Sequence, residues 1–351
     1  MFRKITLGFT FSLLFFQLYS QNEFNSLNEQ LSIYEANKDF NGVILIASED
    51  QIIFSRSVGY ADIKNDIKLD LSTPMHLASN TKAFTNMGIM ILAERGLLDY
   101  DDRVVNYLPG FPYPNVTIRH LMTMTSGLKR LYNKDLDKDG FITNNEILEY
   151  LSKKKPKLSF SPGDQFQSSV VGFCILAEVI SEVAKKDYIE FMKEEIFQPL
   201  QMSDAFIVSK ENLDKFRAIS YNDKFEEEEW FLGSYIGGVG IYASANDMLK
   251  WGQSFYSTKL ISNETLNKAY EKHHYNNGEE SHISLGGWMY WKGYDNLIFK
   301  NGEWVANQSL LWRDLDRKTT IIILNNRKSK ISKFEMMDLI LPILGYDLGK
   351  S

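Results

Sequence analysis

The stretch Ser79-Asn80-Thr81-Lys82 organises the rest of this 351-residue chain. It opens an apolar run, Ala83 to Leu92, that is typical of a buried helix. A serine and a lysine three residues apart on a helix share a face, about one turn from each other. A lysine among apolar neighbours has a lowered pKa, so it can act as the base that a serine nucleophile needs. The first turn of a helix also offers unpaired N–H groups to a developing oxyanion.

Two interpretations of this stretch are open. One is a covalent acyl-transfer centre, with Ser79 as the nucleophile and Lys82 as its base. The other is a serine N-cap followed by a surface lysine, and the four residues taken alone favour it. The choice between the two depends on the other motifs of the chain.

The first 20 residues differ in character from the rest. Arg3 and Lys4 precede an apolar segment from Ile5 to Leu18, and Ser20 is a small residue before Gln21. This pattern predicts a secretory signal peptide over 1–20, because the apolar part is short for a membrane span. We therefore expect a mature chain, 21–351, that is periplasmic or secreted and has no stable membrane span.

The composition of the mature chain is that of a globular protein, with 44% hydrophobic and 24% charged residues in the full sequence. Removing residues 1–20 leaves 37 basic and 45 acidic residues, a net charge of −8 that argues against a nucleic-acid partner. Cys174 is the sole cysteine, so no internal disulfide can form. An exported chain without disulfides indicates a bacterial envelope protein that its core alone stabilises.

Strand-like runs lie near both ends of the chain, and helical patterns fill its middle. The predicted strands are Gly42 to Ala47, Ile52 to Arg56, Gly287 to Trp291, Leu297 to Lys300, Ser309 to Arg313 and Thr319 to Leu324. The predicted helices are 22–37, 83–95, 101–107, 117–123, 144–153, 170–184, 188–200, 245–255 and 332–344. We expect a mixed α/β (α+β) fold, in which both termini build one antiparallel sheet flanked by helices, with an inserted all-helical lobe. The sheet lobe would comprise 22–75 and 285–351, the helical lobe about 76–284, and the cleft would lie between them.

Several blocks of the chain carry a resemblance to one family. The blocks are Ser79 to Thr85, Glu94 to Asp99, Tyr107 to Phe111, Ile118 to Leu128, Pro162-Gly163 with Phe166, and Gly238 to Ser244 with Asp247 and Trp251. Together they resemble the serine beta-lactamase and penicillin-binding-protein-like hydrolases, nearest to the class C beta-lactamase, DD-peptidase and esterase branch. The resemblance covers 40–326 and implies a beta-lactamase/transpeptidase-like fold that works through an acyl-enzyme.

The resemblance also implies roles for individual residues. Ser79 and Lys82 form the first motif, Ser-x-x-Lys, which is intact. The third motif corresponds to Lys300-Asn301-Gly302, with Lys300 as a catalytic cation and Asn301 and Gly302 as substrate-binding residues. The backbone N–H groups of Ser79 and Glu303 would form the oxyanion hole.

The second motif departs from the family pattern. It is usually Tyr-x-Asn, and the corresponding positions here are Ser168-Ser169-Val170. A serine has too high a pKa to replace the tyrosine as a base, although Ser168 could relay a proton from Lys82. Val170 offers no amide to a substrate carbonyl, so this departure leaves the activity open and weakens the recognition of a beta-lactam or peptide.

Residues 135–146 match the EF-hand loop at each key position. The predicted calcium ligands are Asp135, Asp137, Asp139, the carbonyl of Phe141, and Glu146. Extracellular calcium is abundant enough to fill a weak site of this kind. The alternative is a plain Asp-Gly turn followed by a capping box from Thr143 to Glu146, and the helix that should precede a true EF-hand loop is missing. Both interpretations stay open.

These observations favour an exported serine hydrolase that cleaves an ester or amide in a small-molecule or peptide substrate. The acyl-enzyme would form on Ser79 with Lys82 as base, without a required cofactor and with calcium, if bound, in a structural role. The alternative is a non-catalytic binding protein on the same scaffold, which would recognise a cell-wall peptide or a protein partner. No sequence pattern indicates the oligomeric state.

Overall fold

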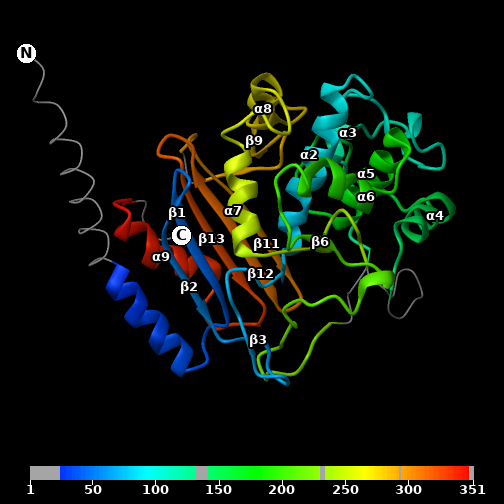
Figure 1. Ribbon diagram of the computed structural model, residues 1–351. Coiled ribbons are helices and arrows are strands. Elements are labelled where there is room, and N and C mark those ends of the chain that lie inside the picture. The colour runs from blue at the N-terminus through cyan, green and yellow to red at the C-terminus, as the bar shows by residue number, and fades with distance from the viewer. Residues whose placement is uncertain (1–23, 132–140, 230–233, 292–293, 348–351) are drawn as a thin grey trace, which may run out of the picture.

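A central antiparallel sheet organises the computed structural model, which describes residues 24–131, 141–229, 234–291 and 294–347 (Figure 1). Eight strands form this sheet in the order β2-β1-β13-β12-β11-β10-β9-β8. Their bounds in that order are Gln51–Val58, Gly42–Ser48, Thr319–Asn325, Asn307–Asp314, Leu297–Trp304, Met289–Tyr290, Glu280–Ser284 and Lys272–His274. Both ends of the chain therefore meet in one sheet, as predicted from the sequence.

The two ends are joined where β1 pairs with β13. The register runs from Gly42 opposite Asn325 to Ser48 opposite Thr319. Both strands are almost completely buried, since they lie in the middle of a sheet that is covered on both faces. The sequences of β1 and β13 are therefore mostly continuous runs of Ile, Leu and Val, without the alternation of apolar and polar residues that a half-exposed strand shows.

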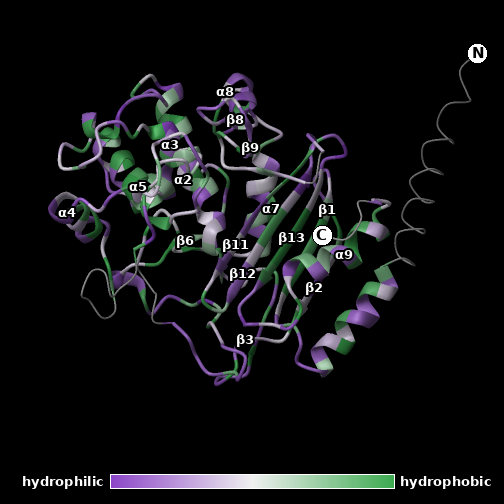
Figure 2. Cartoon of the chain, turned by 180° about the vertical axis from the view of Figure 1, so that it is seen from behind, coloured by the Kyte–Doolittle hydropathy of each residue, from purple (hydrophilic) through white to green (hydrophobic). Residues whose placement is uncertain are grey.

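Two apolar cores lie on the two faces of the sheet (Figure 2). The N-terminal helix (24–36) and α9 (Lys333–Ile343) cover one face and contribute Leu27, Leu31, Met336 and Ile340 to its core. The other face packs against α7 (Ala245–Ser254) and the helical part of the chain. No helix in the described part of the chain is long and apolar enough to cross a membrane.

The helical part of the chain is built around α2 (Thr81–Glu94), which is buried from Thr81 to Leu92. The surrounding helices are α3 (Ile118–Met122), α4 (Asn144–Lys154), α5 (Val170–Ala184), α6 (Tyr188–Met192) and the π-helix η4 (Lys193–Phe197). A Cβ atom at Gly88 would lie 2.9 Å from Ile180 Cδ1, so glycine permits the close packing of α2 on α5. The bounds of α5 are those predicted from its apolar run.

Some short elements differ from the sequence predictions. The helix expected over 101–107 is only a 3-10 turn, η2 (Val104–Asn106), because the Asp102 and Asp99 carboxylates accept turn hydrogen bonds from the backbone N–H groups of Asp99 and Asp101. The stretch 205–235, for which no helix or strand was predicted, contains β6 (Phe206–Ile207) and η5 (Lys210–Asn212). Elements that were not predicted are α8 (Asn263–Ala269), β8, β9, the hairpin of β3 (Tyr60–Asp62) and β4 (Ile67–Lys68), and the small sheet of β5 (Met75–His76), β7 (Ile241–Ala243) and β6 (Phe206–Ile207).

Candidate active site

Ser79 lies in a 3-10 turn, η1 (Ala78–Asn80), directly before α2. Ala78 adopts a φ of +49°, which a non-glycine residue takes only when its surroundings enforce it. Ser309 on β12 supplies such a constraint, because its hydroxyl donates to Leu77 O at 2.5 Å and accepts from Asn80 Nδ2 at 2.7 Å. The central sheet therefore fixes the turn that presents Ser79.

Lys82 contacts Ser79 directly. Its Nζ lies 2.7 Å from Ser79 Oγ and donates to the carbonyl oxygen of Gly238 at 3.0 Å. The lysine is only 3% exposed, and burial, helped by the positive charges of Lys300 and Arg130, lowers its pKa to about 7. A lysine with this pKa is substantially neutral near pH 7 and can accept a proton from the serine hydroxyl.

Gly302 brings strand β11 against the serine turn. A Cβ atom there would lie 2.7 Å from Ser79 N and 2.5 Å from Leu77 O, so only glycine allows this approach. Trp291 N–H donates to Leu297 O at 2.8 Å, so the Leu297 carbonyl points toward the edge of β11 that faces away from β12. Every second residue after Leu297 directs its backbone N–H and C=O groups to this same edge. The pairing of β11 with β12 has no register shift, so the Glu303 N–H points to this edge too, beside η1. Ser79 and Glu303 both line the cavity beside the serine turn, which is the arrangement that the predicted oxyanion hole requires.

Lys300 is a buried residue of β11, two positions before Gly302. It is 3% exposed, its Nζ donates to Gly287 O at 2.8 Å, and burial lowers its pKa to about 8. Its charge reaches Lys82 electrostatically, but Lys300 is not among the residues that line the cavity beside Ser79. Asn301 lies on the opposite face of β11, with Leu297 and Phe299 of the second core, so only its backbone can face the cleft.

A cavity of about 200 Å³ opens beside Ser79. Of the predicted site residues it brings together Ser79, Lys82, Ser168 and Glu303. The Glu303 side chain itself lies 3.3 Å from Lys333 Nζ on α9, so this residue serves the cleft through its backbone. Val170, which the sequence analysis also named, lines the cavity too. The sequence analysis assigned no role to the other lining residues, Arg130, Leu131, Val171 and Trp304.

Arg130 and Ser168 line the same cavity as the serine and contact each other. Arg130 Nε donates to Ser168 O at 3.0 Å, which places a guanidinium beside the position where the family has its tyrosine. Val170 begins α5 and contributes an apolar wall where the family has an amide. No local pattern marks Arg130, since the contact joins residues 38 positions apart.

The calcium prediction falls partly outside the described residues, where Asp135, Asp137 and Asp139 lie. Of the described ligands, Glu146 forms a capping box: its Oε2 accepts from Thr143 N at 2.8 Å and from Thr143 Oγ1 at 2.9 Å. Within the described ranges, no group of three or more His, Cys, Asp or Glu side chains could hold a metal ion. The capping box is therefore present, and calcium binding stays a prediction.

Comparisons with known proteins show the family and the fold of the chain. The family model described as Beta-lactamase matches residues 32–340. Penicillin-binding protein 4* of Bacillus subtilis (strain 168) is 29% identical over 331 residues, which is 88% of this chain and 73% of that protein. Among solved structures, the octameric penicillin-binding protein homologue from Pyrococcus abyssi superposes with a TM-score of 0.78 at 21% identity, over 92% of this chain and 78% of that one. EstCE1, a hydrolase with promiscuous acyltransferase activity, has a TM-score of 0.75 at 19% identity, over 92% of this chain and 99% of that one. The resemblance seen in the sequence is thus confirmed, and the chain belongs to the beta-lactamase family of serine beta-lactamase and penicillin-binding-protein-like proteins.

Proposed function

We propose that this protein is an exported serine hydrolase that cleaves an ester or an amide through an acyl-enzyme on Ser79. The observation that carries the proposal is the 2.7 Å contact between Ser79 Oγ and the Nζ of a buried lysine whose pKa is lowered to about 7. A surface lysine after a serine N-cap would be solvated, whereas Lys82 is enclosed and also bonded to Gly238 O.

The proposed reaction has two steps. Neutral Lys82 takes the Ser79 Oγ proton as Oγ attacks the substrate carbonyl, and the oxyanion accepts hydrogen bonds from the Ser79 and Glu303 N–H groups. The proton then moves from Lys82 to the leaving group, which departs and leaves the acyl-enzyme. In the second step water attacks the acyl carbonyl and gives a proton to Lys82. The bond between the acyl carbon and Ser79 Oγ then breaks, the carboxylic acid leaves, and Lys82 returns the proton to Ser79 Oγ.

The cleft favours a compact acyl group on an activated ester. Its volume is about 200 Å³, and Leu131, Val170, Val171 and Trp304 give it apolar walls. Arg130 sets one cation at the rim, where it would suit an anionic group on the substrate. Ser168 and Val170 supply neither a phenolic proton shuttle nor an amide, so a good leaving group matters more here than in enzymes that have both.

Hydrolysis of p-nitrophenyl acetate and p-nitrophenyl butyrate tests the proposal. The wild type is expected to hydrolyse both esters with a burst of p-nitrophenolate at high enzyme concentration, and Ser79→Ala is expected to abolish burst and turnover. Equal turnover by wild type and Ser79→Ala would refute the assignment. Absence of turnover together with tight binding of a cell-wall peptide would support the non-catalytic alternative, which the replaced second motif favours.

The export component of the proposal rests on residues 1–20. Expression of the full chain in a bacterium with two membranes, followed by cell fractionation and N-terminal sequencing, tests it. We expect a periplasmic product that begins at or near Gln21, whereas a cytoplasmic product that retains Arg3 and Lys4 would contradict it.

A further inference from the structure

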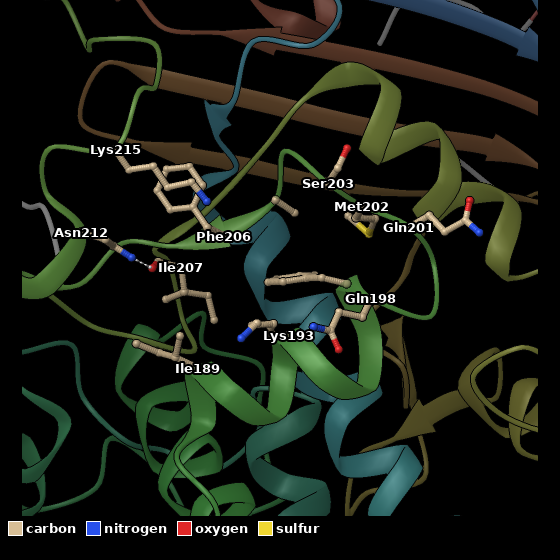
Figure 3. A pocket seen from close by; sticks show the side chains of 12 residues that line it. Ile189, Lys193, Gln198, Gln201, Met202, Ser203, Phe206, Ile207, Asn212 and Lys215 are labelled. Atoms are coloured by element: carbon tan, nitrogen blue, oxygen red, sulfur yellow. Dashed lines mark hydrogen bonds between the residues drawn. The ribbon is translucent and has the colours of Figure 1, made fainter.

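Two cavities in the described part of the chain have more than twice the volume of the cleft, and neither shares a lining residue with it. The first, of about 530 Å³, lies between η4 and β6, with Lys193 and Lys215 at its rim (Figure 3). Both lysines are exposed, and Lys193 pairs with Glu190 at 3.2 Å. The second, of about 480 Å³, is different in kind, because a buried cation lines it.

The second cavity lies where the N-terminal helix, the β3–β4 hairpin and the 219–229 segment meet (Figure 1). We call it the Arg327 pocket. It is lined by Glu35, Lys38, Phe40, Asn41, Gly59, Tyr60, Ile63, Lys68, Phe225 and Arg327. Its volume falls in the range of about 300–1,000 Å³ that is typical of small-molecule sites.

Arg327 is the decisive residue of this pocket. It is 6% exposed, and its guanidinium donates to two backbone carbonyls, those of Lys38 and of Asp223, the latter at 2.8 Å. Its Nε is buried without a hydrogen-bond partner in the described part of the chain. The carboxylates of Asp223 and Asp39 act on Arg327 electrostatically, but the guanidinium's hydrogen bonds go to neutral acceptors, so part of its charge stays uncompensated.

The other charges around the pocket do not neutralise this cation. Lys38 and Lys68 add two more positive charges to the lining, and Glu35 is the single carboxylate among the lining residues that the structure describes. Glu35 already pairs with Arg56 at 3.3 Å, and Asp39 near Arg327 pairs with Lys330 at 2.8 Å. The pocket therefore has an excess of positive charge.

Aromatic rings complete the pocket. The Arg327 guanidinium carbon lies 3.6 Å from the centroid of the Phe225 ring, and Lys68 Nζ lies 3.4 Å from that of Tyr60. Phe225 has a φ of +66°, a conformation that a bulky residue rarely adopts and that tends to be retained at functional sites. An otherwise unfavourable backbone thus holds an aromatic ring against the buried cation.

We propose that the Arg327 pocket binds a small aromatic anion, separately from the catalytic cleft. The anionic group would be held by Arg327, Lys38 and Lys68, and the ring of the ligand would pack against Phe225 and Tyr60. Neither a neutral aromatic molecule nor a cation would compensate the charge of Arg327, so the proposal excludes both as preferred ligands.

The test uses the fluorescent aromatic anion 8-anilinonaphthalene-1-sulfonate and its uncharged analogue N-phenyl-1-naphthylamine, titrated into the mature protein. The test variant is Lys38→Asn with Lys68→Gln, since asparagine tolerates the φ of +56° at Lys38 and both lysines are exposed. Phe225→Asn removes the ring at a position where asparagine accepts the positive φ. Lys215→Gln is the matched control, because it neutralises one cation of the larger cavity (Figure 3).

The wild type is expected to bind the sulfonate more tightly than the neutral analogue. The double lysine variant should bind the sulfonate about tenfold more weakly, as two charge-assisted contacts are lost, and Phe225→Asn should also weaken it. Lys215→Gln should bind as the wild type does, and ester hydrolysis should be unchanged in all three variants. Unchanged sulfonate binding in the double variant, equal binding of the neutral analogue, or loss of binding in Lys215→Gln would overturn the proposal.

Discussion

Gly302 approaches Ser79 so closely that a Cβ atom on the glycine would lie 2.7 Å from the serine backbone nitrogen. Gly302→Ala must therefore push β11 away from η1 and move the Glu303 N–H relative to that of Ser79. We expect this variant to lose about 10²-fold in the rate of ester hydrolysis, the size of effect that a displacement of about 1 Å produces in a catalytic group. Gly110→Ala is the control, because nothing lies within 4 Å of its added Cβ. Wild-type kcat/KM in Gly302→Ala would show that β11 takes no part in the site.

The pH dependence of ester hydrolysis should reflect two lysines. Lys82 must be neutral to accept a proton, so kcat/KM should rise with pH as Lys82 deprotonates around its pKa of about 7. Burial lowers the pKa of Lys300 to about 8, so its positive charge, and any help it gives to the reaction, should be lost at higher pH. The profile is therefore expected to be a narrow bell between these two values. Lys300→Met should remove the alkaline limb and shift the acid limb to higher pH, because the Lys300 charge helps to lower the pKa of Lys82. A wild-type acid limb that lies well below pH 6 would contradict the role of Lys82.

Beta-lactam hydrolysis should be weak compared with ester hydrolysis. Ser168 and Val170 line the cleft where the family has Tyr-x-Asn, so an amide leaving group receives little help in taking a proton. Nitrocefin turnover measured beside p-nitrophenyl acetate turnover checks this expectation. A kcat/KM for nitrocefin within the range of efficient enzymes, about 10⁴–10⁸ M⁻¹s⁻¹, would contradict it.

Arg130 should matter for substrates that carry an anionic group. Its guanidinium lines the cavity beside Ser79. Arg130→Gln is expected to raise the KM for a p-nitrophenyl monoester of succinate about tenfold and to leave that for p-nitrophenyl acetate nearly unchanged, since a charge-assisted contact becomes neutral. An equal change for both substrates would assign Arg130 a structural role through its bond to Ser168 instead.

Calcium bound at residues 135–146 is expected to stabilise the fold and not to assist catalysis, because none of the described residues of this loop lines the cleft. The stabilisation would be about 2.7 kcal/mol at a hundredfold excess over Kd. Glu146→Gln should remove most of it and preserve the capping box, since glutamine also serves at that position. Thermal melts of both proteins with calcium and with a chelator provide the measurement, and identical wild-type melts in the two buffers would rule calcium out.

Long apolar patterns made much of the fold predictable. The helix over 170–184 and the strands that begin at 42, 297 and 319 start where the sequence predicted, because continuous burial on a helix or a central strand leaves a long signal. The predicted strands over 309–313 and 297–300 are shorter than β12 (Asn307–Asp314) and β11 (Leu297–Trp304). The small sheet of β5, β7 and β6 was missed because strands of two or three residues carry no readable period. Tertiary pairing creates these strands, and local propensity does not.

The candidate site was predictable only where its residues are close in sequence. Ser79 and Lys82 are three positions apart, and their helical spacing anticipates the contact. Lys82 and Gly238 are 156 positions apart, and Arg130 and Ser168 are 38 apart, so the fold alone brings them together. The side-chain face of Asn301 likewise depends on the strand register, which a motif of three residues does not specify.

The central claim is that Lys82 is the base that activates Ser79. The direct test is the second-order rate of labelling by a fluorophosphonate probe, in which Ser79 Oγ bonds to phosphorus and fluoride leaves, followed by the intact mass of the protein. We predict a single adduct on the wild type, none on Ser79→Ala, and labelling of Lys82→Ala slower by about 10²–10⁴-fold. Lys153→Ala, which changes an exposed lysine, should be labelled at the wild-type rate. Labelling of Lys82→Ala at the wild-type rate would contradict the account.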